Sequence, residues 1–149
     1  MLAPPGPAEL PLTAPGVRED RPGEEHWRWR LRFAQRIAAT LDAARYAVKG
    51  VYIFGSTKNA TAGPGSDIDL ILHVAGTEQQ NEELSQWLDG WSLALAEMNY
   101  LRTGHRAPRI LDVHFVTDED IAAKRSYAAK IGAVTDAARR LPMKGEPPA

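Results

Sequence analysis

The feature that most constrains the fold is a pair of short apolar runs joined by a linker with no room for a long helix. Residues 48–54 and 67–74 are rich in β-branched and aromatic side chains, which is typical of strands. Only residues 55–66 separate them. Parallel neighbours are usually joined by a helix with a loop at each end, for which this linker is too short, so the spacing predicts an antiparallel or mixed sheet.

Helical periodicity surrounds these two strands. Apolar side chains recur three and four positions apart over residues 25–42 and again over 78–101, which predicts two amphipathic helices. Residues 109–116 have the composition of a third strand, and a capping pattern opens a further helix over 118–128. The predicted order is α-β-β-α-β-α, an α+β domain whose mixed sheet of about three to four strands carries helices on one face.

Proline marks both ends of this unit. All prolines except Pro64 and Pro108 lie within residues 1–23 or 142–149. Segments of this kind hold few large apolar side chains, so they cannot bury enough surface to offset their ordering entropy. We therefore expect flexible tails over 1–23 and 142–149, and a folded domain over 24–141.

Composition excludes several classes of protein. The chain has no cysteine, which excludes a disulfide scaffold and a thiolate metal site. Its net charge of −1 argues against a protein that coats long nucleic acids, because counterion release rewards a large basic excess. No run approaches the roughly 18 apolar residues of a transmembrane helix, and the start has no cationic and apolar leader. We expect a cytoplasmic protein without membrane segments.

Acidic side chains gather on one face of two predicted strands. Because alternate residues of a strand share a face, Asp67 and Asp69 lie opposite the apolar side chains of the second strand. By the same rule Asp112 and His114 lie opposite those of the third strand. Each acid alone is better explained by a turn or a solvent-facing position. Together, three carboxylates repel one another unless a hard cation such as Mg²⁺ or Mn²⁺ joins them, so we predict Asp67, Asp69 and Asp112 as metal ligands.

A Gly55-Ser56 pair follows the first strand directly. Glycine permits an unusual backbone angle and close approach of a ligand, and the N–H groups of such a turn, with the Ser56 hydroxyl, can cradle phosphate oxygens. Lys58 can add a positive charge. Glycine and serine also favour ordinary connecting loops, so the pair alone has little meaning. It gains specificity because Asp67-Ile68-Asp69 opens the next strand ten residues later.

Taken together, these residues resemble the signature of nucleotidyltransferases of the DNA polymerase beta superfamily. That signature is an apolar strand, Gly-Ser, a spacer, Asp-x-Asp between apolar neighbours, and a later strand with a third acid. The chain matches it with Phe54-Gly55-Ser56, Ser66-Asp67-Ile68-Asp69-Leu70 and Leu111-Asp112-Val113. It is most similar to the small, single-domain minimal members. Many of those have arginine two residues after the serine, whereas this chain has Lys58, which cannot offer a bidentate fork.

The resemblance implies a nucleotidyltransferase fold and a metal-dependent reaction. A nucleoside monophosphate would pass from an NTP, ATP being favoured, to an acceptor hydroxyl, and pyrophosphate would leave. Asp67 and Asp69 would hold Mg²⁺ on the triphosphate, and Asp112 would ligate a second ion and help to deprotonate the acceptor. The nucleotide contacts would come from Gly55, Ser56, Lys58 and Ser66.

The acceptor and the partners stay open at this stage. Acceptors in the superfamily include proteins, antibiotics and nucleic-acid ends. A protein hydroxyl is preferred here, because the slightly acidic charge balance disfavours a long nucleic acid. Minimal members often act as antitoxins beside a helical partner, so we expect such a partner or a homodimer. The alternative is a nucleotide-binding regulatory module without turnover, or an antitoxin-like partner of a helical protein.

Two basic stretches are left outside this site. Residues 27–32 alternate aromatic and basic side chains, which we interpret as an apolar helix stripe beside a solvated basic face. The segment over 100–109 carries several arginines and a histidine ahead of the third strand. It is equally consistent with a contact to phosphate or an acidic partner and with a solvated turn.

Overall fold

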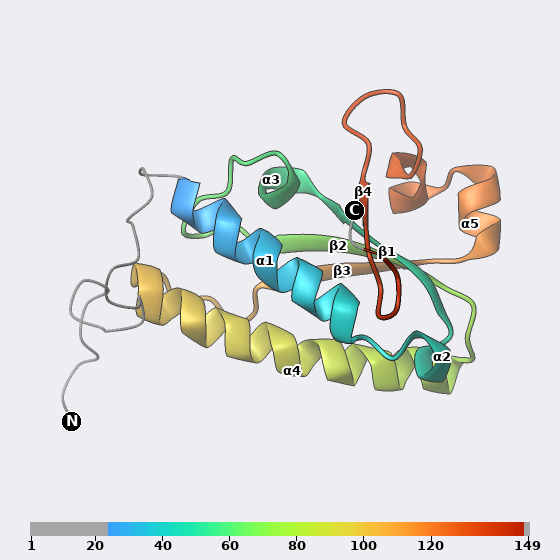
Figure 1. The fold of residues 1–149 in the computed structure, drawn as a ribbon, viewed down its shortest axis with the longest axis horizontal. Coiled ribbons are helices and arrows are strands. Elements are labelled where there is room, and N and C mark those ends of the chain that lie inside the picture. Colours follow the sequence, from blue (N-terminus) through green and yellow to red (C-terminus); the bar gives the residue numbers. More distant parts are fainter. Residues whose placement is uncertain (1–23, 148–149) are drawn as a thin grey trace.

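The computed structural model describes residues 24–147, so the predicted tail over 1–23 lies outside the described residues. Helices and strands alternate along the chain (Figure 1). In chain order they are α1 (Glu24–Thr40), α2 (Ala43–Tyr46), β1 (Val48–Phe54), α3 (Gly55–Lys58), β2 (Ile68–Val74), α4 (Glu78–Thr103), β3 (Leu111–Val116), α5 (Asp118–Ala123), the 3₁₀ helix η2 (Ser126–Lys130) and β4 (Arg139–Leu141). The three predicted strands and the two long predicted helices are confirmed.

The strands form one mixed sheet in the order β3-β2-β1-β4. β1 pairs antiparallel with both β2 and β4, whereas β2 and β3 are parallel. The α4 helix supplies the crossover between β2 and β3, as parallel neighbours require. Within the described residues β3 pairs only with β2, so it is an edge strand.

The two long helices cover one face of the sheet (Figure 1). Their apolar stripes meet the inward side chains of β1 and β2 in one core, in which Ile37, Ile53, Leu70 and Leu84 are fully buried. Thr77 begins α4 with a capping box, because its hydroxyl accepts from the Gln80 N–H while the Gln80 side chain accepts from the Thr77 N–H.

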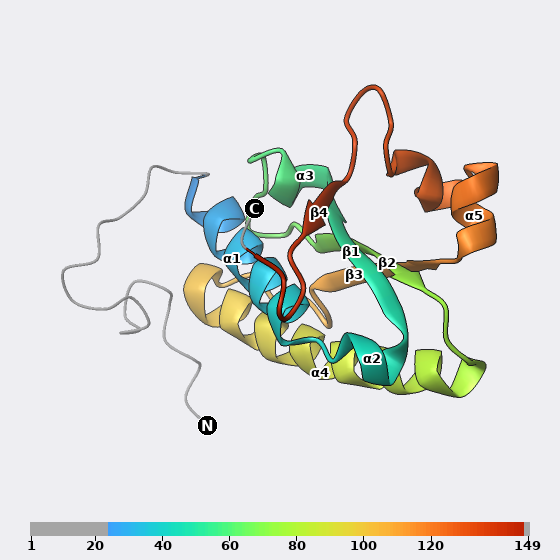
Figure 2. The ribbon, with the colours of Figure 1, turned by 45° about the vertical axis from the view of Figure 1, so that its right-hand side comes forward.

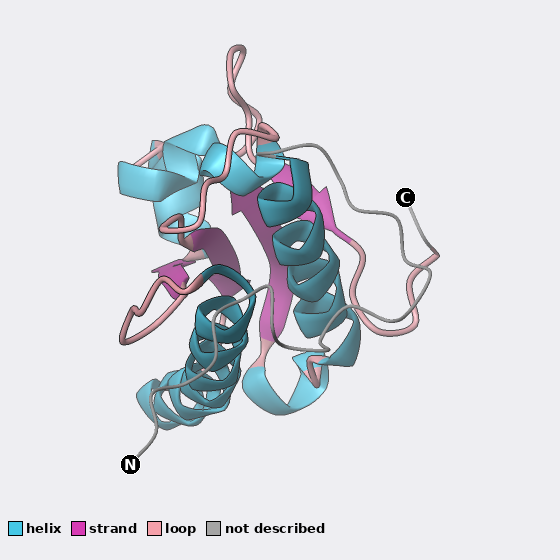
Figure 3. Ribbon diagram, turned by 90° about the vertical axis from the view of Figure 1, so that its left-hand side faces the viewer, coloured by secondary structure: helices cyan, strands magenta, loops and turns pink. Residues whose placement is uncertain are grey.

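A second, smaller cluster lies on the opposite face of the sheet. It joins Phe54, Ile71 and Val116 to Ala128 of η2, with Ile121 of α5 packed beside them. Figure 2 shows the strands between the two long helices and the α5–η2 segment, and Figure 3 shows the strands flanked by helices from another side. The predicted packing on one face therefore holds for the long helices, but α5 and η2 contact the other face.

Some local elements differ from the prediction. The helix expected over 118–128 is interrupted, because Lys124 adopts left-handed backbone angles and ends α5 before η2 begins. The Gly55-Ser56 turn is the start of a short helix, α3, rather than a loop, and β4 was not predicted.

The chain beyond β4 contacts the domain. Met143 packs against the main core, and Arg140 forms an ion pair with Glu146 at 2.8 Å. These contacts involve residues that the prediction assigns to the C-terminal tail over 142–149. In the part of the chain that the structure describes, none of the helices has both the length and the apolarity needed to cross a membrane.

Candidate functional site

The sheet register brings two of the three predicted acids side by side. Asp69 lies opposite Phe54 of β1 and directly beside Asp112 of the parallel strand β3. These three residues form one row across the sheet, on the face away from α1 and α4, because the alternate residues Ile68 and Leu70 are buried in the main core. For Asp69 and Asp112 this register agrees with the prediction of a shared face, whereas Asp67 precedes β2 and lies outside the paired residues.

Electrostatic interactions join the third acid to this pair. Burial, the charges of Asp112 and Asp67 and a hydrogen bond with Asp112 raise the pKa of Asp69 from 3.8 to about 6. Partial burial and the charge of Asp112 also raise the pKa of Asp67, and Arg30 and Arg109 oppose that rise. Like charges that raise one another's pKa indicate carboxylates held close together without enough compensating positive charge.

Gly55 is required where β1 ends. Its φ of +74° lies in the left-handed region that favours glycine. A Cβ built at this position would clash with the Asp69 carboxylate. Gly55 therefore lies directly against the Asp69 carboxylate, the kind of close approach that the sequence predicts for this glycine.

The other predicted nucleotide contacts have different surroundings. Lys58 donates to the Asp136 carboxylate at 2.9 Å and to the Ala137 carbonyl at 2.9 Å, so the loop before β4 holds its ammonium group. The Ser66 hydroxyl accepts from the Gly63 N–H at 2.8 Å and closes the turn ahead of Asp67. Ser56 is partly buried in the first turn of α3.

The sequence analysis missed Arg30, which holds the loop that leads into Asp67. Its guanidinium donates to the Ser66 carbonyl at 3.0 Å, the Pro64 carbonyl at 3.2 Å and the Asn99 side-chain oxygen at 2.9 Å. Asn99, in turn, donates to the Pro64 carbonyl. Arg30 is fully buried, and its desolvation lowers its pKa to about 10.

The expectation of a solvated basic face over 27–32 is therefore wrong for Arg30, although Arg28 and Arg32 are exposed. A signal was present in the sequence. Arg30 lies four and seven residues before Ala34 and Ile37, which places it on the apolar stripe of the helix.

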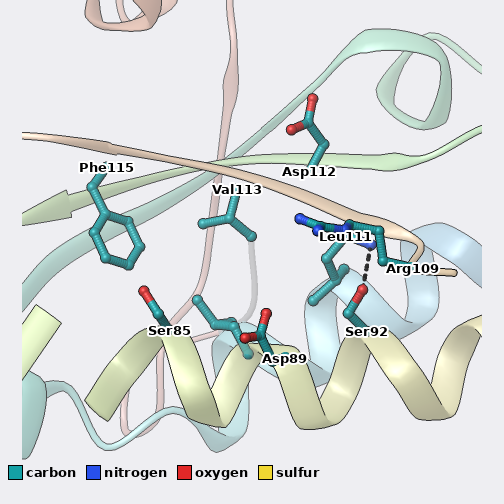
Figure 4. A pocket seen from close by; sticks show the side chains of 9 residues that line it. Ser85, Asp89, Ser92, Arg109, Leu111, Asp112, Val113 and Phe115 are labelled. Atoms are coloured by element: carbon teal, nitrogen blue, oxygen red, sulfur yellow. Dashed lines mark hydrogen bonds between the residues drawn. The ribbon is translucent and has the colours of Figure 1, made fainter. Parts of the chain in front are cut away.

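A cavity of about 370 Å³ lies between α4 and β3. Figure 4 shows Leu111, Val113 and Phe115 directed toward Ser85, Asp89 and Ser92 of the helix, while Asp112 points to the other side of the strand. The Ser92 hydroxyl accepts from the N–H groups of Ile110 and Leu111 at 3.0 Å each and so fixes the start of β3. The main volume of the cavity and the carboxylates thus lie on opposite sides of β3.

The acid pair suits a hard divalent cation by its donor chemistry. Asp69 and Asp112 offer carboxylate oxygens from adjacent strands, and burial together with the charges of Asp112 and Asp67 raises the pKa of Asp69, a penalty on the carboxylate that a cation would offset. Among the described residues, no three His, Asp or Glu side chains already form a group that could hold a metal ion. A site including Asp67 would therefore require its side chain to turn toward the pair.

Comparison with known proteins identifies one family. Residues 35–128 match the model of the nucleotidyltransferase domain family, a span that holds β1, β2, β3 and all three acids. None of the curated proteins matches the chain. A crystal structure titled as a "putative nucleotidyltransferase from Sulfolobus solfataricus" aligns with 72% of this chain and 85% of its own, at 18% identity and a TM-score of 0.41.

Proposed function

The chain belongs to the nucleotidyltransferase domain family, and from that premise we propose that it is a metal-dependent enzyme that transfers a nucleoside monophosphate from an NTP to an acceptor hydroxyl. The NTP to test first is ATP, and the preferred acceptor is a hydroxyl of another protein. One observation carries this proposal: Asp69 and Asp112 are register partners, with the Gly55-Ser56 turn directly against Asp69. This arrangement puts a candidate phosphate turn beside two carboxylates.

The carboxylates would hold the metal. Asp69 and Asp112 would supply adjacent oxygens, and Asp67, directly before β2, would complete the set once its side chain turns toward them. A bound Mg²⁺ or Mn²⁺ would supply the positive charge that lets a triphosphate approach three acids. The pKa values of Asp69 and Asp67, both raised, support a site that favours a cation over bare carboxylates.

The chain's own residues would then orient the two substrates. The backbone N–H groups at Gly55 and Ser56 and the Ser56 hydroxyl donate to oxygens of the β- and γ-phosphates. Asp112 accepts the proton of the acceptor hydroxyl, whose oxygen attacks the α-phosphorus as the bond to the pyrophosphate oxygen breaks. Asp112 suits this role because its side chain is 49% exposed, so an acceptor can reach it from solvent.

A second function is supported by the environment of Lys58. Its ammonium group is bound to Asp136 and Ala137, and its side chain is only 14% exposed. A lysine held in this way would be less available to a triphosphate, which favours a nucleotide-binding regulatory module, or an antitoxin-like partner of a helical protein, without turnover. Under the enzyme proposal, by contrast, the Asp136 contact must open or Lys58 must act only as part of the scaffold.

Label transfer from α-³²P-ATP separates the two functions. The protein is incubated with Mg²⁺ or Mn²⁺ and with cell lysate as the pool of acceptors, beside Asp69→Asn. Metal-dependent labelling of a discrete species that Asp69→Asn loses would support the enzyme and isolate its acceptor. Binding of ATP without labelling above the level of Asp69→Asn would favour the regulatory module.

The outcome for Lys58 sharpens this test. Asp136→Asn weakens the ion pair of Lys58 and leaves the proposed metal ligands Asp67, Asp69 and Asp112 unchanged. Increased ATP affinity in Asp136→Asn would mean that Lys58 binds phosphate once it is released. Unchanged affinity would assign Lys58 a structural role.

A further inference from the structure

His114 is the nearest polar neighbour of Asp112 along its own strand. Both side chains project from the same face of β3. His114 lies two residues after Asp112 and pairs with Ile71 of β2, as Asp112 pairs with Asp69. The Nε2 atom of His114 lies 3.2 Å from Oδ2 of Asp112. That nitrogen is buried and makes no hydrogen bond of good geometry to any described residue, Asp112 included, so a small turn of the Asp112 carboxylate would be needed to complete one across this distance.

The ring of His114 is held from the opposite side. Tyr127 of η2 stacks on it, with ring centroids 3.6 Å apart and an angle of 19° between the rings. Phe54 contacts both rings, at 6.1 Å from His114 and 5.6 Å from Tyr127. The imidazole thus packs against two aromatic rings, and the His114 side chain is 22% exposed. Aromatic contacts of this kind restrict where a ring can point.

Asp112 needs such a neighbour. Its side chain is half-exposed at the edge strand, where a short carboxylate has several accessible rotamers. A hydrogen bond from one side would hold one of its oxygens and leave the other free to face Asp69. Positioning of this kind matters because small displacements of a reacting group lower the rate strongly.

We propose that His114 is a positioning residue for Asp112: clamped beneath Tyr127, its Nε2 holds one oxygen of the Asp112 carboxylate, so that the other faces Asp69 and the acceptor. This inference rests on the proposed transfer function, in which Asp112 is the group at the acceptor. It also assigns a role to the α5–η2 segment, which supplies Tyr127 and covers the neighbouring end of the sheet.

Two substitutions at position 114 separate the ring from its nitrogen. His114→Phe keeps an aromatic ring under Tyr127 and removes Nε2, whereas His114→Gln keeps an amide N–H near Asp112 and loses the stack. We expect His114→Phe to lower kcat about tenfold or more while the KM for ATP stays within about twofold, since hydrogen bonds to charged groups are the stronger class. His114→Gln should recover most of that loss.

His73 provides the matched control. It projects from the same face of the sheet, but its Nε2 contacts Asp118 at 2.5 Å rather than Asp112. His73→Gln should therefore leave kcat unchanged. An equal loss in His73→Gln and His114→Phe, or a His114→Phe enzyme with the wild-type kcat, would overturn the inference.

A second measurement needs no activity. With ¹³C-labelled aspartate, the carboxyl carbon resonance of Asp112 should move in His114→Phe, return toward its wild-type position in His114→Gln, and stay unchanged in His73→Gln. If the carboxyl resonance of Asp112 has the same chemical shift in the wild type and in both His114 variants, the contact does not form in solution. If the variants show the expected resonance shifts but the wild-type protein labels no acceptor, the proposed function is overturned and the contact between His114 and Asp112 still holds.

Discussion

The two faces of the same strands have opposite characters. Toward the long helices, Ile68 and Leu70 of β2 are completely buried in the main core. Toward the other face, burial and the charges of Asp112 and Asp67 raise the pKa of Asp69 to about 6. Burial of apolar surface stabilises the first face, whereas close packing of carboxylates costs stability on the second. The comparison indicates that the helix-covered face holds the fold together, while the other face carries a carboxylate pair at a cost in stability.

Substitutions at two adjacent residues of β2 should give the largest difference between the two faces. Leu70→Ala should lower the free energy of unfolding by about 3 kcal/mol, because it leaves a cavity in the main core. Asp69→Asn, one residue away, should leave that free energy unchanged or raise it at neutral pH, because it removes a repelling charge. Urea unfolding of the two variants measures both. A loss in Asp69→Asn as large as that in Leu70→Ala would contradict the division between the faces.

Arg30 tests whether a buried polar group on the helix-covered side serves the opposite face. Arg30→Met should cost about 2–3 kcal/mol of unfolding free energy, because the Ser66 carbonyl and the Asn99 side-chain oxygen lose their donor and the Pro64 carbonyl keeps only Asn99. The exposed Arg32 of the same helix is the matched control, and Arg32→Met should change stability by less than about 0.5 kcal/mol. Thermal unfolding followed by circular dichroism compares them. Equal effects would mean that Arg30 does not hold the loop before Asp67.

Substitution of Gly55 and of Gly90 by alanine should change stability by smaller amounts and in opposite directions. Gly55→Ala should destabilise the protein by about 1–2 kcal/mol, because its φ is positive, and displacement of the Asp69 carboxylate should add to that loss. Gly90 lies in α4, and a Cβ there would meet no atom within 4 Å. Gly90→Ala should therefore stabilise the protein by about 0.5–1 kcal/mol, through helix propensity. Chemical unfolding of the two variants checks both signs, and a stabilising Gly55→Ala would refute the close contact.

The pH dependence of the free energy of unfolding should show the cost of burying the Asp69 carboxylate beside other acids, and this effect is expected to be the smallest. Because the pKa of Asp69 is about 6 in the folded chain and 3.8 is its ordinary value, the folded state keeps a proton that the unfolded state releases between these values. The free energy of unfolding contributed by Asp69 therefore falls as the pH rises from about 4 to 6, by about 1–2 kcal/mol after allowance for solvent screening.

The difference between the wild type and Asp69→Asn isolates this contribution, since carboxylates elsewhere, such as Asp118 and Asp136, have lowered pKa values and act with the opposite sign. Measured without divalent cations, the difference should shrink to zero below pH 4. Added Mg²⁺ should stabilise the wild type above pH 6 and lose that effect as Asp69 takes up its proton. A pH-independent difference between the two proteins would contradict the raised pKa.

The elements predicted from the sequence were those with a strong local period. The strand predicted over 48–54 coincides with β1, and the helix predicted over 78–101 with most of α4. The short elements were missed for identifiable reasons. α3 has four residues and starts at a glycine, and β4 has three residues whose pairing with β1 depends on a return of the chain from α5 and η2. Neither contains a full period to detect.

For the site, the sequence alone determined which residues could share a face. The twofold period of a strand assigns Asp67, Asp69 and Asp112 to the side opposite their apolar neighbours, and Gly55 is visible in the sequence directly after the first apolar run. Their roles as ligands and nucleotide contacts stay predictions.

Only the tertiary structure decided which residues meet. The parallel pairing of β2 with β3 makes Asp69 and Asp112 neighbours, and the fold brings Arg30 to the loop at 63–66, Tyr127 to His114 and Asp136 to Lys58. These contacts join residues from 13 to 78 positions apart, and local periodicity carries no information about partners at such separations. Strand order and the packing of α5 and η2 settle them, because each depends on burying apolar surface across the whole domain.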